Sequence, residues 1–196
     1  MMQIEAIPST PVYYPVQIAA AATARQHLVI VERAEWLKPE QLNPLSDAAG
    51  SLFVYLLGNK ILRLSTRARY ECRSFNDVQS LWATVEAFLS QARMGLRLYV
   101  IGSEPFLWQA SAIATRYGMT TDSMQLELAG KPSRNVYCIH CRHTIRDTET
   151  NLVTCPSCGK TLAVRAHFSR RLGAYIGVQA DAEEPGVLPP VEELRR

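Results

Sequence analysis

Residues 96–129 read LRLYVIGSEPFLWQASAIATRYGMTTDSMQLELA, and their pattern changes twice. The first six residues form an apolar run typical of a buried strand, and Gly102-Ser103 then turns the chain. Apolar side chains next recur at helical spacing until Gly118 ends the helix; they are Phe106, Leu107, Ala110, Ile113, Ala114 and Tyr117. Residues 124–129 alternate as a strand does. This strand–helix–strand order with short links predicts parallel strands.

The residues before this unit extend the same pattern. One apolar stripe at helical spacing comprises Val78, Leu81, Trp82, Val85, Phe88, Leu89 and Ala92. We expect Asn76 or Ser74 to cap this helix and Gly95 to end it. Two apolar runs, residues 27–31 and 52–57, fit buried strands. Gly58-Asn59 predicts a turn into a hairpin with residues 61–66. We therefore predict an N-terminal arm over residues 1–19 and an α/β domain with a mostly parallel sheet over residues 20–130.

Four of the five cysteines form two Cys-x-x-Cys pairs: Cys138 with Cys141, and Cys155 with Cys158. Each pair places two thiolates on a tight turn, and two such turns facing each other build a tetrahedral all-sulfur site. Strand-like residues flank the second pair. The pattern predicts a zinc ribbon of two hairpins over residues 131–178, holding one structural Zn²⁺. The same thiolates could instead hold one iron and transfer electrons.

Other residues with chemical potential carry weaker signals. His140 and His143 flank the first cysteine pair, but four thiolates already fill the site, so we expect exposed imidazoles. Cys72 is isolated, and we expect an ordinary half-buried thiol. Gly102-Ser103 occupies the position of a phosphate-binding turn, yet no G-x-G-x-x-G or Walker motif accompanies it. We predict no catalytic and no cofactor-binding residue.

The segment HFSRRLGAYIG, residues 167–177, predicts a short amphipathic helix that follows the ribbon. Residues 131–178 hold eight lysines and arginines against only two acidic residues, so this region is a basic island. We predict a docking face for a partner subunit, formed by His167, Phe168, Arg170 and Arg171. Residues 179–196 form an acidic, proline-rich tail that we expect to become ordered only on binding a partner.

Two stretches resemble a known family. YCIHC at residues 137–141 and VTCPSCGKTLAVRAHFSRRLGAYIGV at residues 153–178 resemble the C-terminal region of the DmmA family, the small accessory subunit of bacterial dimethylamine monooxygenase. The resemblance implies a cytoplasmic assembly that demethylates dimethylamine to methylamine and formaldehyde, using dioxygen and reduced nicotinamide. It also implies that the haem lies on one partner subunit and the flavin and iron–sulfur centre on a reductase subunit, which this non-catalytic chain organises or bridges.

A second likeness concerns the α/β domain. Residues 98–130 are similar to the last strand–helix–strand unit of the nicotinamide-binding lobe of ferredoxin reductases. That lobe has a Cys-Gly-Pro turn where this chain has Ile101-Gly102-Ser103. The likeness implies a degenerate, reductase-lobe-like scaffold that has lost its cofactor contacts, and we do not predict nicotinamide binding from it.

Composition narrows the remaining classes. No apolar run approaches the length of a membrane span, and residues 1–10 lack a secretory pattern, so we expect a cytoplasmic protein with reduced thiols. A nucleic-acid-binding zinc ribbon is one alternative, because arginines and aromatic residues alternate in the basic island. The short basic stretch and the isoelectric point of about 8.6 argue against it. An electron-transfer subunit with iron in the four-cysteine site is the other alternative.

Overall fold

The computed structural model describes residues 10–18, 24–42, 50–60 and 70–194. The chain divides into two compact units: the first covers Tyr13–Gly130, and the second covers the residues from Lys131 onward, to which the described residues 10–12 also belong. Each unit has its own five-stranded sheet. No described helix is long and apolar enough to cross a membrane.

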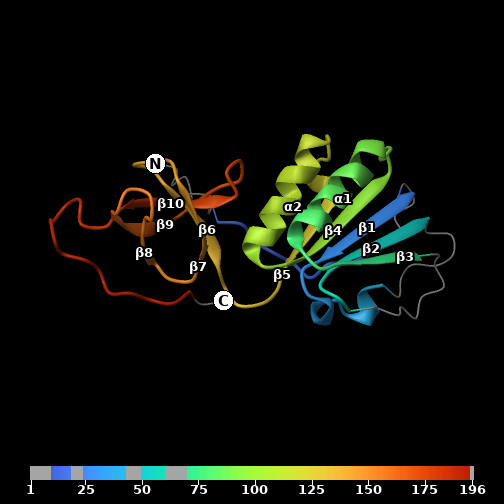
Figure 1. The fold of residues 1–196 in the computed structure, drawn as a ribbon, viewed down its shortest axis with the longest axis horizontal. Helices are drawn as coiled ribbons and strands as arrows, with labels where there is room; N and C mark the ends of the chain where they lie inside the picture. Colours follow the sequence, from blue (N-terminus) through green and yellow to red (C-terminus); the bar gives the residue numbers. More distant parts are fainter. Residues whose placement is uncertain (1–9, 19–23, 43–49, 61–69, 195–196) are drawn as a thin grey trace, which may run out of the picture. The chain divides into compact units, whose positions relative to one another are not determined.

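The first unit is built on a sheet whose five strands are all parallel, in the order β3-β2-β1-β4-β5 (Figure 1). The strands are β1 (Gln26–Val31), β2 (Ser51–Leu57), β3 (Tyr70–Phe75), β4 (Leu96–Gly102) and β5 (Met124–Leu128). Val29 at the centre of β1 lies opposite Val54 on one side and Tyr99 on the other. The mostly parallel sheet predicted from the sequence is therefore present.

Two helices cover one face of this sheet, α1 (Val78–Gln91) and α2 (Glu104–Arg116) (Figure 1). Two short 3₁₀ turns follow β1, η1 (Ala34–Trp36) and η2 (Pro39–Gln41). Asp77 caps α1, because its carboxylate accepts the Ser80 N–H at 2.8 Å. The prediction of Asn76 or Ser74 as the cap was therefore wrong, although Asn76 is only one residue away from Asp77.

Both faces of the sheet are buried, which explains the continuous apolar runs of the central strands. On the helix-bearing face, Leu28 and Ile30 of β1 pack in a core shared with α1 and α2. On the opposite face, Val29 and Val31 pack with Ile18 of the segment that precedes β1. Residues 13–18 are therefore part of this unit and contribute to its core.

The predicted hairpin partner of β2, residues 61–66, lies outside the described residues. Strand β2 pairs with β1 on one side and with β3 on the other, both in parallel. Both edges of β2 are thus occupied by described strands. Strand β3 was not predicted, because its residues are polar and mostly exposed at the sheet edge.

The second unit is an all-strand structure with the order β7-β6-β10-β9-β8. Its strands are β6 (Arg134–Cys138), β7 (Thr144–Thr148), β8 (Leu152–Thr154), β9 (Thr161–Ser169) and β10 (Ala174–Gln179). Strands β6 and β7 form one antiparallel hairpin, and β8 and β9 form another. The central strand β10 joins them, pairing antiparallel with β9 and parallel with β6.

The predicted helix over residues 167–177 was wrong, because this segment is the end of β9, a turn and the start of β10. Phe168 pairs with Tyr175 across the two strands, and their rings meet edge to face at a centroid distance of 5.0 Å. Gly173 adopts the left-handed conformation that the turn needs, with φ 59°. The few apolar residues fit a helical spacing, but cross-strand pairing with β6 and β9 decides the structure.

The end of the acidic tail pairs with the second unit. Leu194 N–H donates to Glu149 O at 2.8 Å, and Asn151 N–H donates to Glu192 O at 3.0 Å. Thr150 and Glu193 form an antiparallel bridge between these two bonds. Residues 190–194 thus contact the segment between β7 and β8, and the expectation that the tail becomes ordered only on binding a partner stays a prediction.

We expect Gly177→Ala to lower the free energy of unfolding of the second unit by about 1–3 kcal/mol. A Cβ at this position would lie 2.7 Å from Val136 Cγ1 and 3.0 Å from Leu162 Cδ1, closer than packed carbons tolerate. Urea unfolding followed by near-ultraviolet circular dichroism measures the loss. Val136→Ala removes the nearer atom, so the double variant should lose less than the sum of the single losses. Simple additivity would contradict the proposed clash.

Candidate metal centre

The four paired cysteines lie at the turns of the two hairpins. Cys138 ends β6, and Cys141 follows it in the turn to β7. Cys155 and Cys158 lie in the turn between β8 and β9. Strand β10 brings the two turns together, since it pairs with both β6 and β9.

The backbone of the two turns is folded in the same way. In the first turn, Cys138 N–H donates to His143 O and Arg142 N–H donates to Cys138 O, each at 2.9 Å. The same two bonds recur at 2.9 Å in the second turn, from Cys155 N–H to Lys160 O and from Gly159 N–H to Cys155 O. Each turn therefore presents its two thiols to the same site, as a shared ion requires.

The sulfur atoms are spaced for one tetrahedral ion. Cys138 Sγ lies 3.8 Å from Cys158 Sγ, and Cys141 Sγ lies 3.5 Å from Cys155 Sγ. All four sulfurs lie within 4.8 Å of one another, and none forms a disulfide. Four sulfurs at about 2.3 Å from a central zinc in a tetrahedron stand about 3.8 Å apart. The donor set therefore fits a single thiophilic ion with no further ligand.

The environment of the thiols favours a cation. Cys138 and Cys155 are fully buried. The His143 backbone N–H is the main group that lowers the pKa of Cys141, to about 6. The Lys160 backbone N–H lowers the pKa of Cys158, but desolvation and the three neighbouring thiols together raise it to about 11. A bound cation would stabilise all four thiolates at once, and its binding would release protons.

The histidines beside the first pair are not part of this group. His140 and His143 are exposed, and the group of potential metal ligands within the described residues contains only the four cysteines. Sequence analysis did not single out Ser157, whose hydroxyl hydrogen-bonds Cys141. Its place between the two cysteines of the second pair is the signal that could have found it.

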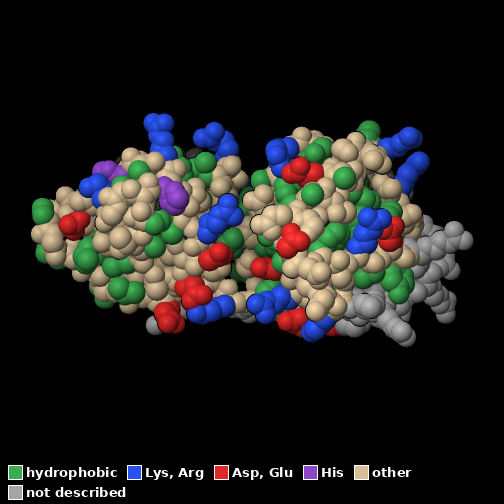
Figure 2. Space-filling model, viewed as in Figure 1, with side chains coloured by type: hydrophobic (Ala, Val, Ile, Leu, Met, Phe, Trp, Pro, Cys, Tyr) green, Lys and Arg blue, Asp and Glu red, His purple; other side chains and the backbone are tan. Residues whose placement is uncertain are grey.

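The residues predicted as a docking face are divided by the structure. His167, Arg170 and Arg171 are exposed at the end of β9 and in the turn that follows. Phe168 is only 6% exposed and packs on Tyr175, so its ring supports the turn from inside. Figure 2 shows basic and histidine side chains on the surface of the second unit.

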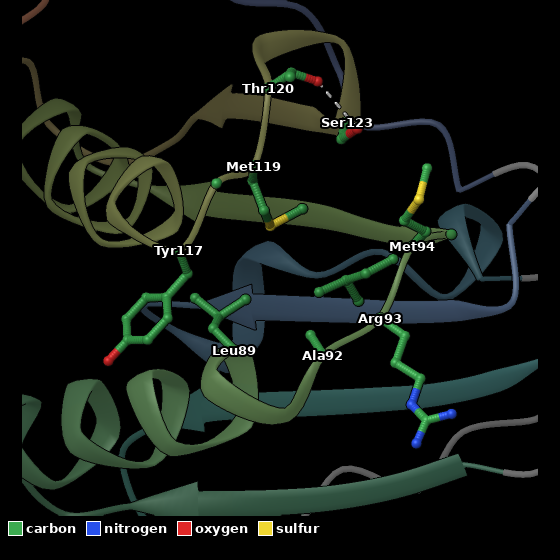
Figure 3. Close-up of a pocket in the computed structure, with 11 residues that line it drawn as sticks. Leu89, Ala92, Arg93, Met94, Tyr117, Met119, Thr120 and Ser123 are labelled. Carbon is green, nitrogen blue, oxygen red and sulfur yellow. Dashed lines mark hydrogen bonds between the residues drawn. The ribbon is translucent and has the colours of Figure 1, made fainter.

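The first unit offers no comparable cluster among its described residues. Cys72 is half-buried in β3 and packs against the core, as expected. A cavity of about 370 Å³ lies at the C-terminal ends of α1 and α2, between Leu89, Met94 and Met119 (Figure 3). Arg93 is its only charged lining residue, so the cavity holds no acid–base pair. We assign it no chemistry.

We expect Arg142→Gly to raise the free energy of unfolding by about 0.5–1 kcal/mol. Arg142 has φ 65°, a left-handed conformation that costs a residue with a side chain about 1–2 kcal/mol, of which the flexibility of glycine offsets part. Gly159, with φ 73°, is the equivalent residue of the second turn. A Cβ there would meet nothing within 4 Å, so Gly159→Ala is a matched control that should be destabilised by backbone conformation alone. Thermal unfolding of metal-loaded protein measures both, and an unchanged Gly159→Ala would contradict the argument.

Comparison with known proteins agrees with the division into two units. The family model of the DmmA-like N-terminal domain matches residues 5–124, and that of the DmmA-like C-terminal domain matches residues 135–178. The delta subunit of the heme-dependent oxidative N-demethylase of Ectopseudomonas mendocina (strain ymp) is 41% identical over 117 residues, which cover 59% of this chain and 67% of that protein. No solved structure matches the chain. The chain belongs to the family of DmmA-like dimethylamine monooxygenase subunits.

Proposed function

We propose that this chain is a non-catalytic accessory subunit of a haem-dependent oxidative N-demethylase that acts on dimethylamine. The similar protein from Ectopseudomonas mendocina is the delta subunit of a heme-dependent oxidative N-demethylase. The observation that carries the non-catalytic role is the closed donor set: four sulfurs lie within 4.8 Å of one another. An ion held by four thiolates has no open coordination position for substrate or dioxygen. A catalytic zinc site, in contrast, keeps one position open.

The ion that this role calls for is one structural Zn²⁺, bound by Cys138, Cys141, Cys155 and Cys158 in a zinc ribbon. Zinc is redox-inert and contributes folding free energy when it closes such a site. In this chain it would hold the β6–β7 and β8–β9 turns together. The ion would supply this crosslink and take no part in the oxidation.

The oxidative chemistry would lie on partner subunits. Demethylation of dimethylamine to methylamine and formaldehyde consumes dioxygen and two electrons from reduced nicotinamide, and it yields water. A haem subunit would activate dioxygen, and a reductase subunit with flavin and an iron–sulfur centre would deliver the electrons. The present chain would organise or bridge these two subunits in the cytoplasm.

The partner-binding face would include His167, Arg170 and Arg171. These exposed residues lie on a hairpin end that the Phe168–Tyr175 ring pair holds from inside. A rigid basic turn suits an acidic patch on a partner, because complementary charge speeds association and fixes orientation. Phe168 belongs to this proposal only as a positioning residue.

We expect Cys155→Ser to abolish metal binding, to unfold the second unit and to release the partner subunits. A serine hydroxyl is a poor zinc ligand, and Cys155 is fully buried in the cluster. Elemental analysis should give about one zinc per chain for the wild type and far less for the variant. Tagged protein purified from its host is then compared for co-eluting haem absorbance. Cys72→Ser, outside the cluster, is the control and should keep both metal and partners.

Two results would contradict this proposal. Unchanged assembly of the Cys155→Ser variant would show that the ribbon does not organise the complex. Iron in place of zinc, seen as a visible thiolate-to-iron absorption band, would favour the electron-transfer alternative.

We expect Arg170→Glu combined with Arg171→Glu to weaken partner binding without unfolding the unit. Reversing two exposed charges changes the attraction to an acidic partner but leaves the core intact. Wild-type binding should also weaken as salt rises from about 50 to 500 mM, because salt screens exposed charges. Arg146→Glu on strand β7 is the matched control, since Arg146 is also exposed. Equal binding by the double variant and the wild type would remove this face from the proposal.

A further inference from the structure

The strand order of the first unit marks one position where a parallel sheet receives ligands. The chain runs from β1 to its neighbour β2 on one side, and from β4 to its neighbour β5 on the other. The order therefore reverses between β1 and β4. In open parallel sheets a nucleotide binds outside the carboxyl ends of the strands at such a reversal, with its phosphates at a helix N-terminus.

The helix N-terminus at this position already carries a carboxylate from the chain itself. Glu32 follows β1, and its Oε2 accepts the Ser103 N–H at 2.6 Å. Ser103 is the N-cap of α2, and its own side chain makes no capping bond. A negative charge is stabilised there by the free N–H groups and the helix dipole. Glu32 therefore occupies the anion position at this helix N-terminus.

Gly102 makes room for this internal anion. A Cβ on Gly102 would lie 2.9 Å from Glu32 Oε2 and 2.6 Å from Phe106 Cδ1. In dinucleotide-binding turns a glycine lets the pyrophosphate approach the backbone. Here the lack of a side chain admits the carboxylate of Glu32 instead.

The connection after β1 is the main phosphate-binding turn of a dinucleotide fold, and the described residues of this connection do not have that form. A dinucleotide fold places a glycine-rich turn and a long helix there. This chain has Glu32-Arg33 and then η1, a 3₁₀ turn of three residues. Among the described residues, α2 is therefore the helix that begins at the reversal point, and Glu32 already caps its N-terminus.

The segment Tyr13–Ile18 is fastened beside the same edge of the sheet. Tyr13 Oη donates to Glu104 Oε1 at 2.7 Å in the first turn of α2, and it accepts the Trp108 Nε1–H at 2.7 Å. Val16 N–H donates to Glu127 Oε2 at 2.7 Å, near the carboxyl end of β5. Val16 and Ile18 are buried. The segment thus runs from the N-terminus of α2 past the carboxyl end of β5 into the core.

We infer that the ligand position of this sheet is filled by the protein itself, with the Glu32 carboxylate as a built-in anion and residues 13–18 as a fixed cover. The domain then serves as a structural module that takes no dinucleotide. This inference rests on the first unit alone and does not depend on the metal centre or on the identity of the complex.

Chemical rescue tests the built-in anion. Glu32→Ala leaves the α2 N-terminus without its charge and opens space for a small anion. We expect its melting temperature to fall by several degrees and to recover with millimolar formate or inorganic phosphate, which should not shift the wild type by as much. Glu32→Gln fills the space without the charge, so it should be less stable than the wild type but gain nothing from formate. Glu35→Ala, an exposed carboxylate in the same connection, is the control.

A melting temperature of Glu32→Ala equal to that of the wild type, or an equal response of both proteins to the anions, would overturn the assignment of Glu32. Titration of the full wild-type chain with NADH provides an independent measurement that does not require a variant to fold. We expect no saturable heat. Saturable binding of NADH that protects the Gly102 and Ser103 amides from hydrogen exchange would overturn the inference as a whole.

Discussion

The second unit depends on four sulfur atoms held within 4.8 Å of one another. Thiolates at this distance repel, and thiols at this distance leave the cluster without a bond that joins the two hairpins. The apolar support around the cluster is thin, because β8 has only three residues and the core beneath the sulfurs is Leu162 with its half-buried neighbours. A unit of this size seldom gains enough from apolar burial alone. A bound cation would supply the attraction that the side chains lack, and the surface formed by β9 and β10 would then depend on it.

The first unit solves its stability problem by burial instead. Helices cover one face of the parallel sheet, and the other face carries a core that includes Val16 and Ile18. The carboxyl edge of the sheet is not covered in this way. Polar backbone groups of the strands and the positive N-terminus of a helix lie there. Enzymes of this architecture use that edge for ligands. In this chain Glu32, Glu104 and Glu127 each bond a backbone or side-chain donor there, so the edge is satisfied internally.

The elements whose sequence signal is local could be predicted from the sequence. Each of these elements has a residue spacing that is set within the element itself. They are the apolar stripe of α1, the strand–helix–strand unit and the paired cysteines, and the structure contains all of them. The edge strand β3 was missed because an exposed strand lacks alternation. The helix expected over residues 167–177 was wrong because a few apolar residues fit two periods, and pairing with β6 and β9 decides between them. The pairing partners of residues 167–177 lie elsewhere in the chain, so this segment alone does not reveal the pairing.

Gly102 and Gly177 are further examples of residues whose role depends on a distant part of the chain. Gly102 and Gly177 both lie where a Cβ would strike a side chain from a distant part of the chain: Glu32 in one case, Val136 in the other. Neither glycine has a positive φ, so no turn signal in the neighbouring sequence marks it. From the sequence alone, each is indistinguishable from an ordinary turn or strand residue. Their role is to let two segments approach closely, the cap to its helix and β10 to β6. Such a role belongs to a pair of positions, and it becomes visible only when the fold brings both members together.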